Sequence, residues 1–406
     1  MAKVNPFLCY TTSAQFTGAG TAYPIKTAAG VYYIVYVEVN TTDLVFRKST
    51  DGGITWSAPT VIRAGTVVSV ATWYDRWSNI SAGLIHCAYT DGGANDTFYR
   101  TIDTENSDTL STETTIFNGA SDAAGGALSI TRSRGGNVYC KTMIDAGSEG
   151  GFFKLLNANV PNGAWEAALT DTEALATTDQ WHLVPGSALD DNDIMCIFYD
   201  ASALGLSRYV YDDSANSWAE GAIIADGSIT LVAASSNYPH FSVAVDLTNS
   251  QILVVAWNAI DAANQDLLGF TVTESAITAF TTAPVSNATD DCGFAGIAID
   301  TATQDWYVYY GGKSDGSDTF TTSLSLNYKV STDDGATWGA ETDLPLSGSD
   351  ATGARLVSVG CLFACPRFDT RQIVYFTVNT SGLVATVDEP AAAAGGGAVR
   401  AQIIGG

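Results

Sequence analysis

The most regular feature of the sequence is a short apolar strand that recurs seven times, at about one copy per 50 to 60 residues. The copies are rich in Val, Ile, Tyr and Phe, and many end on an aromatic residue. They occupy residues 31–36, 84–89, 137–142, 194–199, 252–257, 306–310 and 373–376. No long segment with a helical period competes with them. Because these strands are apolar on both faces, we expect each to be sandwiched between two neighbouring layers.

The length of this repeat is near that of a four-stranded propeller blade. We therefore predict an all-β fold, a single β-propeller of four-stranded antiparallel blades, with seven blades or, as the alternative, six. The blades begin near residues 21, 68, 127, 180, 238, 293 and 352, and the recurrent apolar strand is the second strand of each. The predicted propeller domain spans residues 1–390.

The seventh unit has room for three strands, so its open edge needs a cover. The run at residues 7–12 can return as the fourth strand and join the two ends of the chain, and residues 399–404 are the alternative cover. We favour the N-terminal run, because the Ala/Gly linker at 391–397 suits a tail that reaches elsewhere. We expect residues 391–406 to be a linker and C-terminal tail that anchors the protein to other subunits of an assembly.

A second repeat is a turn motif with the pattern Ser-x-Asp-x-Gly-x-x-Trp. The Ser and Asp side chains bond nearby backbone N–H groups, Gly takes a positive φ, and Trp packs under the turn. Full copies stand at residues 49–56 and 331–338, and a weakened copy contains Asp213 and Trp218. The motif residues are Ser49, Asp51, Gly53 and Trp56 in the first copy and Ser331, Asp333, Gly335 and Trp338 in the second.

This motif resembles the Asp-box, or BNR repeat, of sialidase-like β-propellers. The resemblance implies that the box joins the third and fourth strands of a blade, on the rim away from the ligand face. For a sialidase it also implies three Arg on the sialic carboxylate, a Tyr nucleophile activated by Glu, and an Asp acid/base. The family's Arg-Ile-Pro motif is missing, since the nearest run is residues 23–26, Tyr-Pro-Ile-Lys, and none of the ten Glu has a recognisable Tyr context. An arginine triad can be drawn from Arg76, Arg132 or Arg134, and Arg367.

The charge excludes some partners. A net charge of −25, from 43 acidic and 18 basic residues, opposes binding to nucleic acids and to anionic lipid surfaces. We expect no membrane insertion and no Sec-type signal peptide, because the chain lacks both an apolar run of about 20 residues and a basic start followed by an apolar stretch. Seven Cys is an odd number, so we expect no disulfide framework, with Cys87, Cys140 and Cys196 as small buried hydrophobes in one repeated position.

If the ring centre and its loops form the ligand face, the inner strands supply the contacts. Aromatic rings beside hydrogen-bonding groups suit a sugar, whose apolar face stacks while its hydroxyls need directed partners. The candidate ligand-binding residues are Arg76, Trp77, Arg132, Arg134, His182, His240 and Arg367. For each of them the alternative role is packing or charge neutralisation between blades.

Metal and cofactor chemistry has little support in the sequence. The three His have no ligand spacing, and we predict no metal site and no cofactor. The acidic runs at 190–193 and 315–318 could offer oxygens to Ca²⁺, although neither matches an EF-hand loop and solvated turns are the alternative.

We therefore expect a non-catalytic binding and structural propeller without catalytic residues. A component of a larger assembly fits, such as a bacteriophage virion protein of the tail, fibre or head decoration, with a loop face that binds a glycan or receptor. Such a protein would be synthesised in the cytoplasm and located in the virion. The alternatives are a sialidase-like exo-glycoside hydrolase and a free lectin-like bacterial protein.

Overall fold

The protein is analysed as a computed structural model. The described residues are 7–10, 22–27, 29, 31–37, 41–50, 57–74, 83–93, 96–119, 128–145, 149–166, 169–170, 179–186, 192–200, 203, 205–225, 241–246, 249–258, 266–285, 292–299, 303–311, 314, 326–344, 355–361, 373–379, 382–389 and 402–405. Within these ranges the regular structure is almost entirely β, apart from the 3-10 helix η2 (Asn157–Asn159). They include no helix that is long and apolar enough to span a bilayer.

The described strands form seven antiparallel sheets, numbered here as blades one to seven in chain order. From the inner strand outward, blade one contains β2 (Ala22–Lys26), β3 (Tyr32–Val37), β4 (Leu44–Ser49) and β5 (Thr60–Arg63). Blade two contains β6 (Val67–Tyr74), β7 (Leu84–Asp91), β8 (Asp96–Asp103) and an outer strand that is split into β9 (Thr109–Leu110) and β10 (Thr114–Phe117). Blade three contains β11 (Ser129–Arg132), β12 (Val138–Asp145), β13 (Glu149–Leu155) and β14 (Leu169–Thr170). Blade four contains β15 (Gln180–Pro185), β16 (Ile194–Asp200), β17 (Gly205–Asp212) and β18 (Ser217–Ala225), and blade five contains β19 (Phe241–Asp246), β20 (Gln251–Trp257), β21 (Leu267–Val272) and β22 (Ile277–Ala279). Blade six contains β23 (Gly293–Ile299), β24 (Trp306–Gly311), β25 (Leu326–Ser331) and β26 (Thr342–Leu344). Blade seven contains β27 (Arg355–Cys361), β28 (Ile373–Asn379) and β29 (Gly382–Glu389), and β1 (Phe7–Tyr10) and β30 (Gln402–Gly405) lie at its outer edge.

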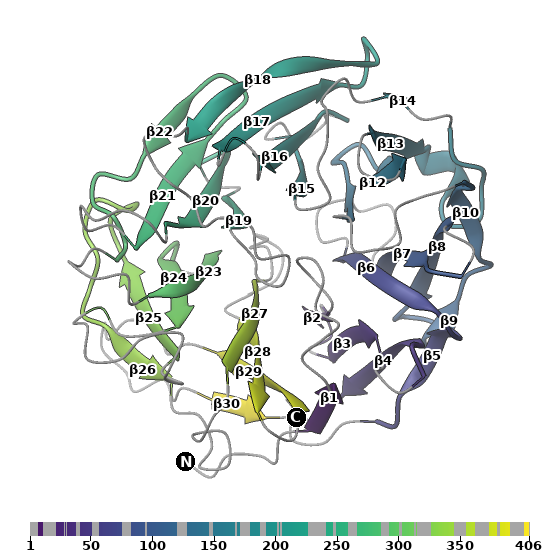
Figure 1. Cartoon of the computed structure of the whole chain (residues 1–406), viewed down its shortest axis with the longest axis horizontal. Helices are drawn as coiled ribbons and strands as arrows, with labels where there is room; N and C mark the ends of the chain where they lie inside the picture. The colour runs from purple at the N-terminus through teal and green to yellow at the C-terminus, as the bar shows by residue number, and fades with distance from the viewer. Residues whose placement is uncertain are drawn as a thin grey trace.

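The sheets stand around a ring with their first strands nearest its centre, so the chain is an all-β propeller (Figure 1). The seven apolar stretches found in the sequence coincide with the second strands β3, β7, β12, β16, β20, β24 and β28. In blades one to six the described strands pair in the order of the chain, which places the turns between their third and fourth strands on the same face of the ring.

The second strands are apolar on both faces because each one contributes to two interfaces between blades. In β16, Ile194 and Cys196 belong to the core shared with blade three, whereas Met195 and Ile197 belong to the core shared with blade five. Successive side chains of a strand point to opposite faces, so the alternation follows from strand geometry. The hydrophobic core is therefore a series of layers between blades.

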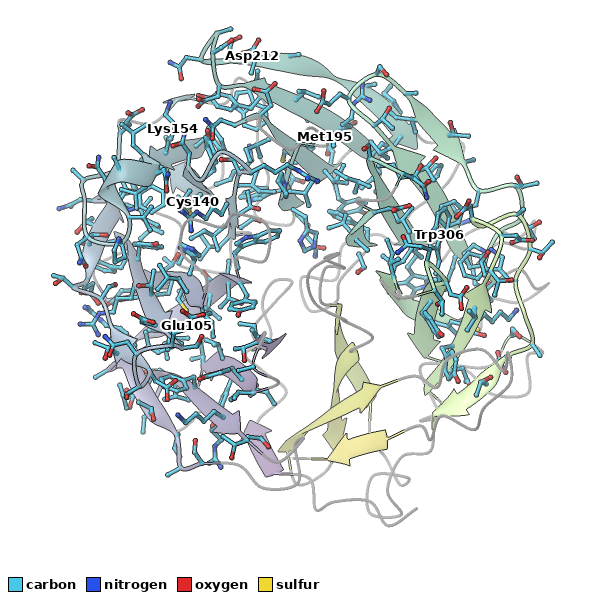
Figure 2. The ribbon with its side chains drawn as sticks, turned by 180° about the vertical axis from the view of Figure 1, so that it is seen from behind. Glu105, Cys140, Lys154, Met195, Asp212 and Trp306 are labelled. Carbon is cyan, nitrogen blue, oxygen red and sulfur yellow. The ribbon has the colours of Figure 1, made fainter. Side chains whose placement is uncertain are left out.

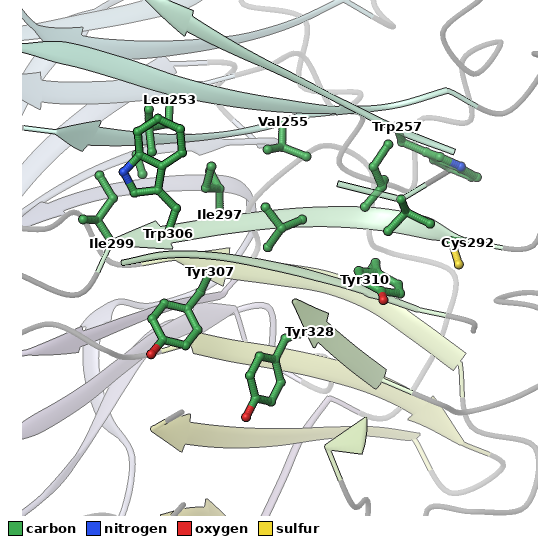
Figure 3. Close-up of a cluster of buried hydrophobic side chains, with 14 residues drawn as sticks. Leu253, Val255, Trp257, Cys292, Ile297, Ile299, Trp306, Tyr307, Tyr310 and Tyr328 are labelled. Atoms are coloured by element: carbon green, nitrogen blue, oxygen red, sulfur yellow. The ribbon is translucent and has the colours of Figure 1, made fainter. Parts of the chain in front are cut away.

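The layer between blades five and six illustrates this packing (Figure 3). Leu253 and Val255 of β20 face Ile297 of β23 and the fully buried Trp306 of β24. Tyr307, the next residue along β24, points to the opposite side of the sheet. Apolar contact area of this kind is the main stabilising contribution to such a fold.

Three cysteines occupy equivalent positions in this layered core. Cys87, Cys140 and Cys196 are at most 2% exposed, and each packs against the preceding blade. Burial raises the pKa of the Cys87 and Cys140 thiols. The sequence-based interpretation of these residues as small buried hydrophobes is confirmed.

Blade seven is edged by two short strands laid end to end along β29. β1 pairs with β29 from Phe7 opposite Ala385 to Tyr10 opposite Leu383. β30 pairs with the rest of the same edge, and its last residue, Gly405, lies opposite Thr386. Both strands are antiparallel to β29, so they form one composite fourth strand (Figure 1). Both segments that the sequence offered as covers thus lie on the edge of this blade, while the division into a propeller of 1–390 and an anchoring tail of 391–406 stays a prediction.

Candidate functional site

The two described arginines of the ring-centre set are turned into the protein. Arg132, at the end of β11, has no exposed surface, and its guanidinium donates to the carbonyl of Gly136 at 2.9 Å and to Asn157 Oδ1 at 2.8 Å. Arg134 is 6% exposed and donates to the carbonyl of Gly186 in blade four at 2.7 Å. A clamp for a substrate carboxylate needs an accessible guanidinium edge, and these contacts instead connect strand ends and neighbouring blades.

His182 is the described member of that set with a partly exposed side chain. It lies on the inner strand β15, and its ring meets the ring of Phe241 on β19 edge to face, with centroids 5.0 Å apart. Burial lowers the pKa of His182 to about 4, so the imidazole is neutral at pH 7. A neutral imidazole both donates and accepts one hydrogen bond, which suits a sugar hydroxyl.

Several predicted residues lie outside the described part of the chain. These are the ligand candidates Arg76, Trp77, His240 and Arg367, and the motif residues Asp51, Gly53 and Trp56. Ser49, the first residue of that motif, is buried at the end of β4.

The second full motif, at 331–338, forms a hydrogen-bonded turn between β25 and β26. Ser331 Oγ donates to Asp333 Oδ1 at 2.9 Å and accepts from the Gly335 N–H at 2.8 Å. Asp333 in turn accepts from the backbone N–H of Thr337 at 2.9 Å and from its hydroxyl at 2.6 Å. These hydrogen bonds, led by that of the Thr337 hydroxyl, hold the pKa of Asp333 below its usual value.

Gly335 and Trp338 show why the motif needs these residue types. Gly335 has a φ of +79°, and a Cβ there would lie 2.8 Å from the Trp306 ring. The indole N–H of Trp338 donates to the carbonyl of Thr282 in blade five at 3.0 Å, and the Thr282 hydroxyl donates back to the Ala336 carbonyl at 2.8 Å. The turn therefore joins two blades as well as two strands.

The weakened motif of blade four differs in detail from the prediction. Its turn-forming carboxylate is Asp212, which accepts from Ser214 Oγ at 2.7 Å and from the Ala215 N–H at 2.8 Å. These hydrogen bonds, led by that of Ser214, lower the pKa of Asp212. Trp218 packs against Phe152 of blade three, with ring centroids 4.8 Å apart. Asp213, to which we assigned the turn, makes its contacts with blade three. In Figure 2, Asp212 lies at the outer edge of the ring and Met195 lies further in.

The contacts of Asp213 form a charged joint, which we call the latch between blades three and four and define as Tyr139, Lys154 and Asp213. The fully buried Tyr139 hydroxyl donates to Asp213 Oδ1 at 2.7 Å, and Lys154 Nζ donates to the same oxygen at 3.1 Å. Lys154 also pairs with Glu166 at 3.3 Å. Tyr139 and Lys154 face each other on β12 and β13, so one blade supplies the donors and the next supplies the acceptor.

The same latch occurs between blades one and two. Tyr33 on β3 faces Lys48 on β4, the Tyr33 hydroxyl donates to Asp108 Oδ1 at 2.6 Å, and Lys48 pairs with Asp108 Oδ2. In both latches the Tyr and Lys are 15 residues apart in the sequence. The Asp follows the Tyr by 75 residues in the latch between blades one and two and by 74 residues in the latch between blades three and four. In both latches the Asp comes from the turn between the third and fourth strands of the next blade.

The pKa values of three latch residues, Tyr33, Tyr139 and Lys154, are raised. Burial, together with the neighbouring carboxylate, raises the pKa of Tyr33 and of Tyr139. Burial lowers the pKa of Lys154, but the hydrogen bond and charge of Asp213 outweigh it, so the pKa is raised overall. The two phenols are therefore neutral hydrogen-bond donors at pH 7 rather than acid–base catalysts.

Two further tyrosines bind glutamates, a pairing that sequence inspection missed. The Tyr89 hydroxyl donates to Glu113, and the Tyr310 hydroxyl donates to Glu341 Oε2 at 2.6 Å. Neither tyrosine has exposed surface, and burial, with the glutamate, raises the pKa of both. A sialidase-type nucleophile needs an accessible phenol that ionises readily, so these pairs join strands of one blade and do not provide that chemistry.

The described charges are distributed unevenly. All ten described Lys and Arg side chains are buried or partly buried, and none falls in the exposed class. The described turns between third and fourth strands instead expose acidic residues, namely Glu105, Glu166, Glu274, Asp333 and Asp334. We call this set the acidic rim, and it lies on one face of the ring because those turns do.

Metal binding finds no support in the described residues, which contain no group of three or more His, Cys, Asp or Glu side chains able to hold an ion. Of the two acidic runs considered for Ca²⁺, only 192–193 is described. There Asp193 Oδ1 accepts from the backbone N–H of Asp213 at 2.9 Å.

No family model matches the sequence, and no curated protein does. Among solved structures, an ulvan lyase of polysaccharide lyase family PL25 is 9% identical, over 95% of this chain and 96% of that chain, with a TM-score of 0.58. The ulvan lyase bound to -[GlcA(1-4)Rha3S]- is 9% identical over 93% and 95% of the two chains, with a TM-score of 0.53. The hydrazine synthase of Kuenenia stuttgartiensis is 10% identical over 92% and 97%, with a TM-score of 0.52. Likenesses at this identity show the fold, and the two kinds of enzyme perform unrelated reactions on it.

Proposed function

We propose that this chain is a non-catalytic binding propeller that serves as a subunit of a larger assembly. The observation that carries the proposal is that these described polar groups form hydrogen bonds and ion pairs with other protein groups, within a blade or between neighbouring blades. The buried arginines, the Tyr–Glu pairs and both latches bond protein groups, and their phenols have raised pKa values. Groups in this state position strands and do not transfer protons to a substrate.

The ligand class that fits is a neutral glycan. The ulvan lyase with a similar fold is bound to a saccharide that carries a uronic acid and a sulfate. A chain with a net charge of −25, whose described basic side chains are buried or partly buried, repels such a polyanion. A neutral sugar avoids that repulsion, and the partly exposed imidazole of His182 offers a hydrogen bond to a sugar hydroxyl.

The assembly role rests on the sequence of the tail and on the acidic charge. An Ala/Gly linker at 391–397 followed by an apolar strand suits attachment to other subunits, and a bacteriophage virion is the setting we propose. The sialidase-like hydrolase remains the competing proposal, because four of the predicted ring-centre residues lie outside the described part of the chain.

The test offers the purified full chain to immobilised neutral, sialylated and uronic-acid glycans and measures retention and cleavage in the same samples. We expect retention on at least one neutral glycan, weakened by His182→Ala, with neither released sugar nor unsaturated product from any sample. The exposed Asp334→Asn variant serves as a matched control that keeps binding. Release of sialic acid would refute the non-catalytic role, and binding that His182→Ala leaves unchanged would refute the site at His182. Sedimentation of the native source tests the assembly separately, since a free monomer contradicts it.

A further inference from the structure

The outer edge of β29 is an acceptor for a strand that another copy of the chain can supply. β30 covers residues 386–389 of that edge, and β1 covers 383–385. β30 has four residues and, among the described strands, pairs only with β29. A strand of this length with one partner adds little stability by itself, so its hydrogen bonds are readily given up for equivalent ones.

The connection into β30 is longer than pairing within one chain requires. Glu389 and Gln402 lie opposite each other at the start of the ladder, and residues 390–401, twelve in all, join them. Hairpin connections usually have about two to five residues. Twelve residues reach about 40 Å when extended, and eight of them, residues 391–398, are Ala or Gly. The chain is therefore long enough to place β30 on a neighbouring molecule.

A second copy offers the same edge with the same register. Every backbone hydrogen bond that β30 makes to residues 386–389 of its own β29 can be made to those residues of another copy. Exchange of an identical element between protomers needs no new surface. The backbone hydrogen bonds of β30 therefore do not favour its own β29 over that of another copy. The local concentration of the two β29 edges decides which one β30 occupies.

We propose that β30 is an exchangeable strand that links copies of this protein by completing blade seven of a neighbour. This inference rests on the assembly role proposed above and names its joint, with a second copy of the chain as the partner. In dilute solution the tether favours pairing within the chain, because two segments joined by a short linker have an effective concentration on the millimolar scale. Copies that are packed side by side in a particle reach comparable local concentrations, and there the strand passes between them.

The test uses cysteine pairs that report which β29 each β30 occupies. Val387→Cys with Ile404→Cys, and separately Asp388→Cys with Ile403→Cys, place thiols at facing positions of the ladder. Adjacent facing pairs alternate between closer and wider spacing, so one of the two meets the geometry of a disulfide. Isotopically heavy and light proteins are mixed, concentrated at physiological salt and oxidised, and the cross-linked peptides are analysed by mass spectrometry. The four single-cysteine variants control for the native thiols.

Exchange predicts heavy–light peptide pairs that increase with protein concentration. Deletion of 391–397 leaves five connecting residues, enough for a hairpin but too few to reach a neighbour, and should leave only heavy–heavy and light–light pairs. Leu8→Cys with Val384→Cys joins β1 to β29 and should also give only like pairs. The proposal is overturned if the protein with the full-length linker gives only heavy–heavy and light–light pairs at every concentration, or if no cross-link forms. Particles that still sediment as large species while giving only like pairs would refute the exchange and leave the assembly role standing.

Discussion

Replacing Asp213 by Ala removes the acceptor that joins blade four to blade three, and the size of the effect can be worked from the latch. The buried Tyr139 hydroxyl loses its 2.7 Å bond, which leaves a buried donor unpaired at a cost of about 1–3 kcal/mol. Lys154 loses one partner but keeps Glu166, whose side chain is 45% exposed, so this loss adds about 0–1 kcal/mol. We expect Asp213→Ala to lower the free energy of unfolding by about 1–4 kcal/mol.

A double-mutant cycle with Tyr139→Phe isolates the hydroxyl bond. Tyr139→Phe alone should cost about 1 kcal/mol, and Asp213→Ala should cost less in the Phe background, giving a coupling energy of about 1–2 kcal/mol. Urea unfolding followed by tryptophan fluorescence measures all four proteins. The exposed Asp334→Asn variant, on the acidic rim, should change stability by less than about 0.5 kcal/mol. Additive losses, or an Asp213→Ala effect no larger than that of the control, would refute the latch.

Other features give further expected outcomes. Asp108→Ala should destabilise the protein by the same mechanism, with a cycle against Tyr33→Phe that shows coupling of the same sign. Gly335→Ala should cost about 2–4 kcal/mol in urea unfolding, because Ala is strained at positive φ and its Cβ meets a ring. His182 binds a proton in the unfolded chain below a pKa of about 6.5 but in the folded protein only near pH 4. The free energy of unfolding should therefore decrease as the pH is lowered from about 6.5 to about 4, by at most about 1.4 kcal/mol per pH unit from this group. The decrease should be less steep in His182→Gln. Thiol labelling of native protein should leave Cys87 unmodified until urea unfolds the chain, and labelling in buffer alone would contradict its burial.

The sequence predicted the elements that obey local rules. A second strand packs against a neighbouring blade on each face, so it carries apolar residues on both faces and is visible as a short apolar run, as at Ile194 and Met195. The turn at Ser331 and Asp333 was predictable because its hydrogen bonds join residues at most four positions apart. In both cases the physical constraint lies within a few residues of the chain.

The joints between blades could not be predicted in this way. The position of Arg132 on an inner strand was clear from the sequence, but whether its side chain faces the ring centre or a neighbouring loop depends on residues such as Asn157, 25 positions away. Asp213 was assigned to the turn because Asp212 next to it has the same chemistry, and only the approach of Tyr139 separates their roles. A usable signal was present, since the Tyr-to-Lys spacing of 15 residues occurs in both latches and the Asp follows at nearly the same distance.

The composite edge of blade seven means that the ring has no intrinsic starting point. Phe7 and Gly405 face adjacent residues of β29, Ala385 and Thr386, and their strands run in the same direction. A peptide bond made directly between Gly405 and Phe7, with residue 406 and residues 1–6 removed, would turn two strands into one without altering the ladder. Circular permutants opened at an exposed turn between a third and a fourth strand, such as the one after Asp212, should then fold to the same propeller.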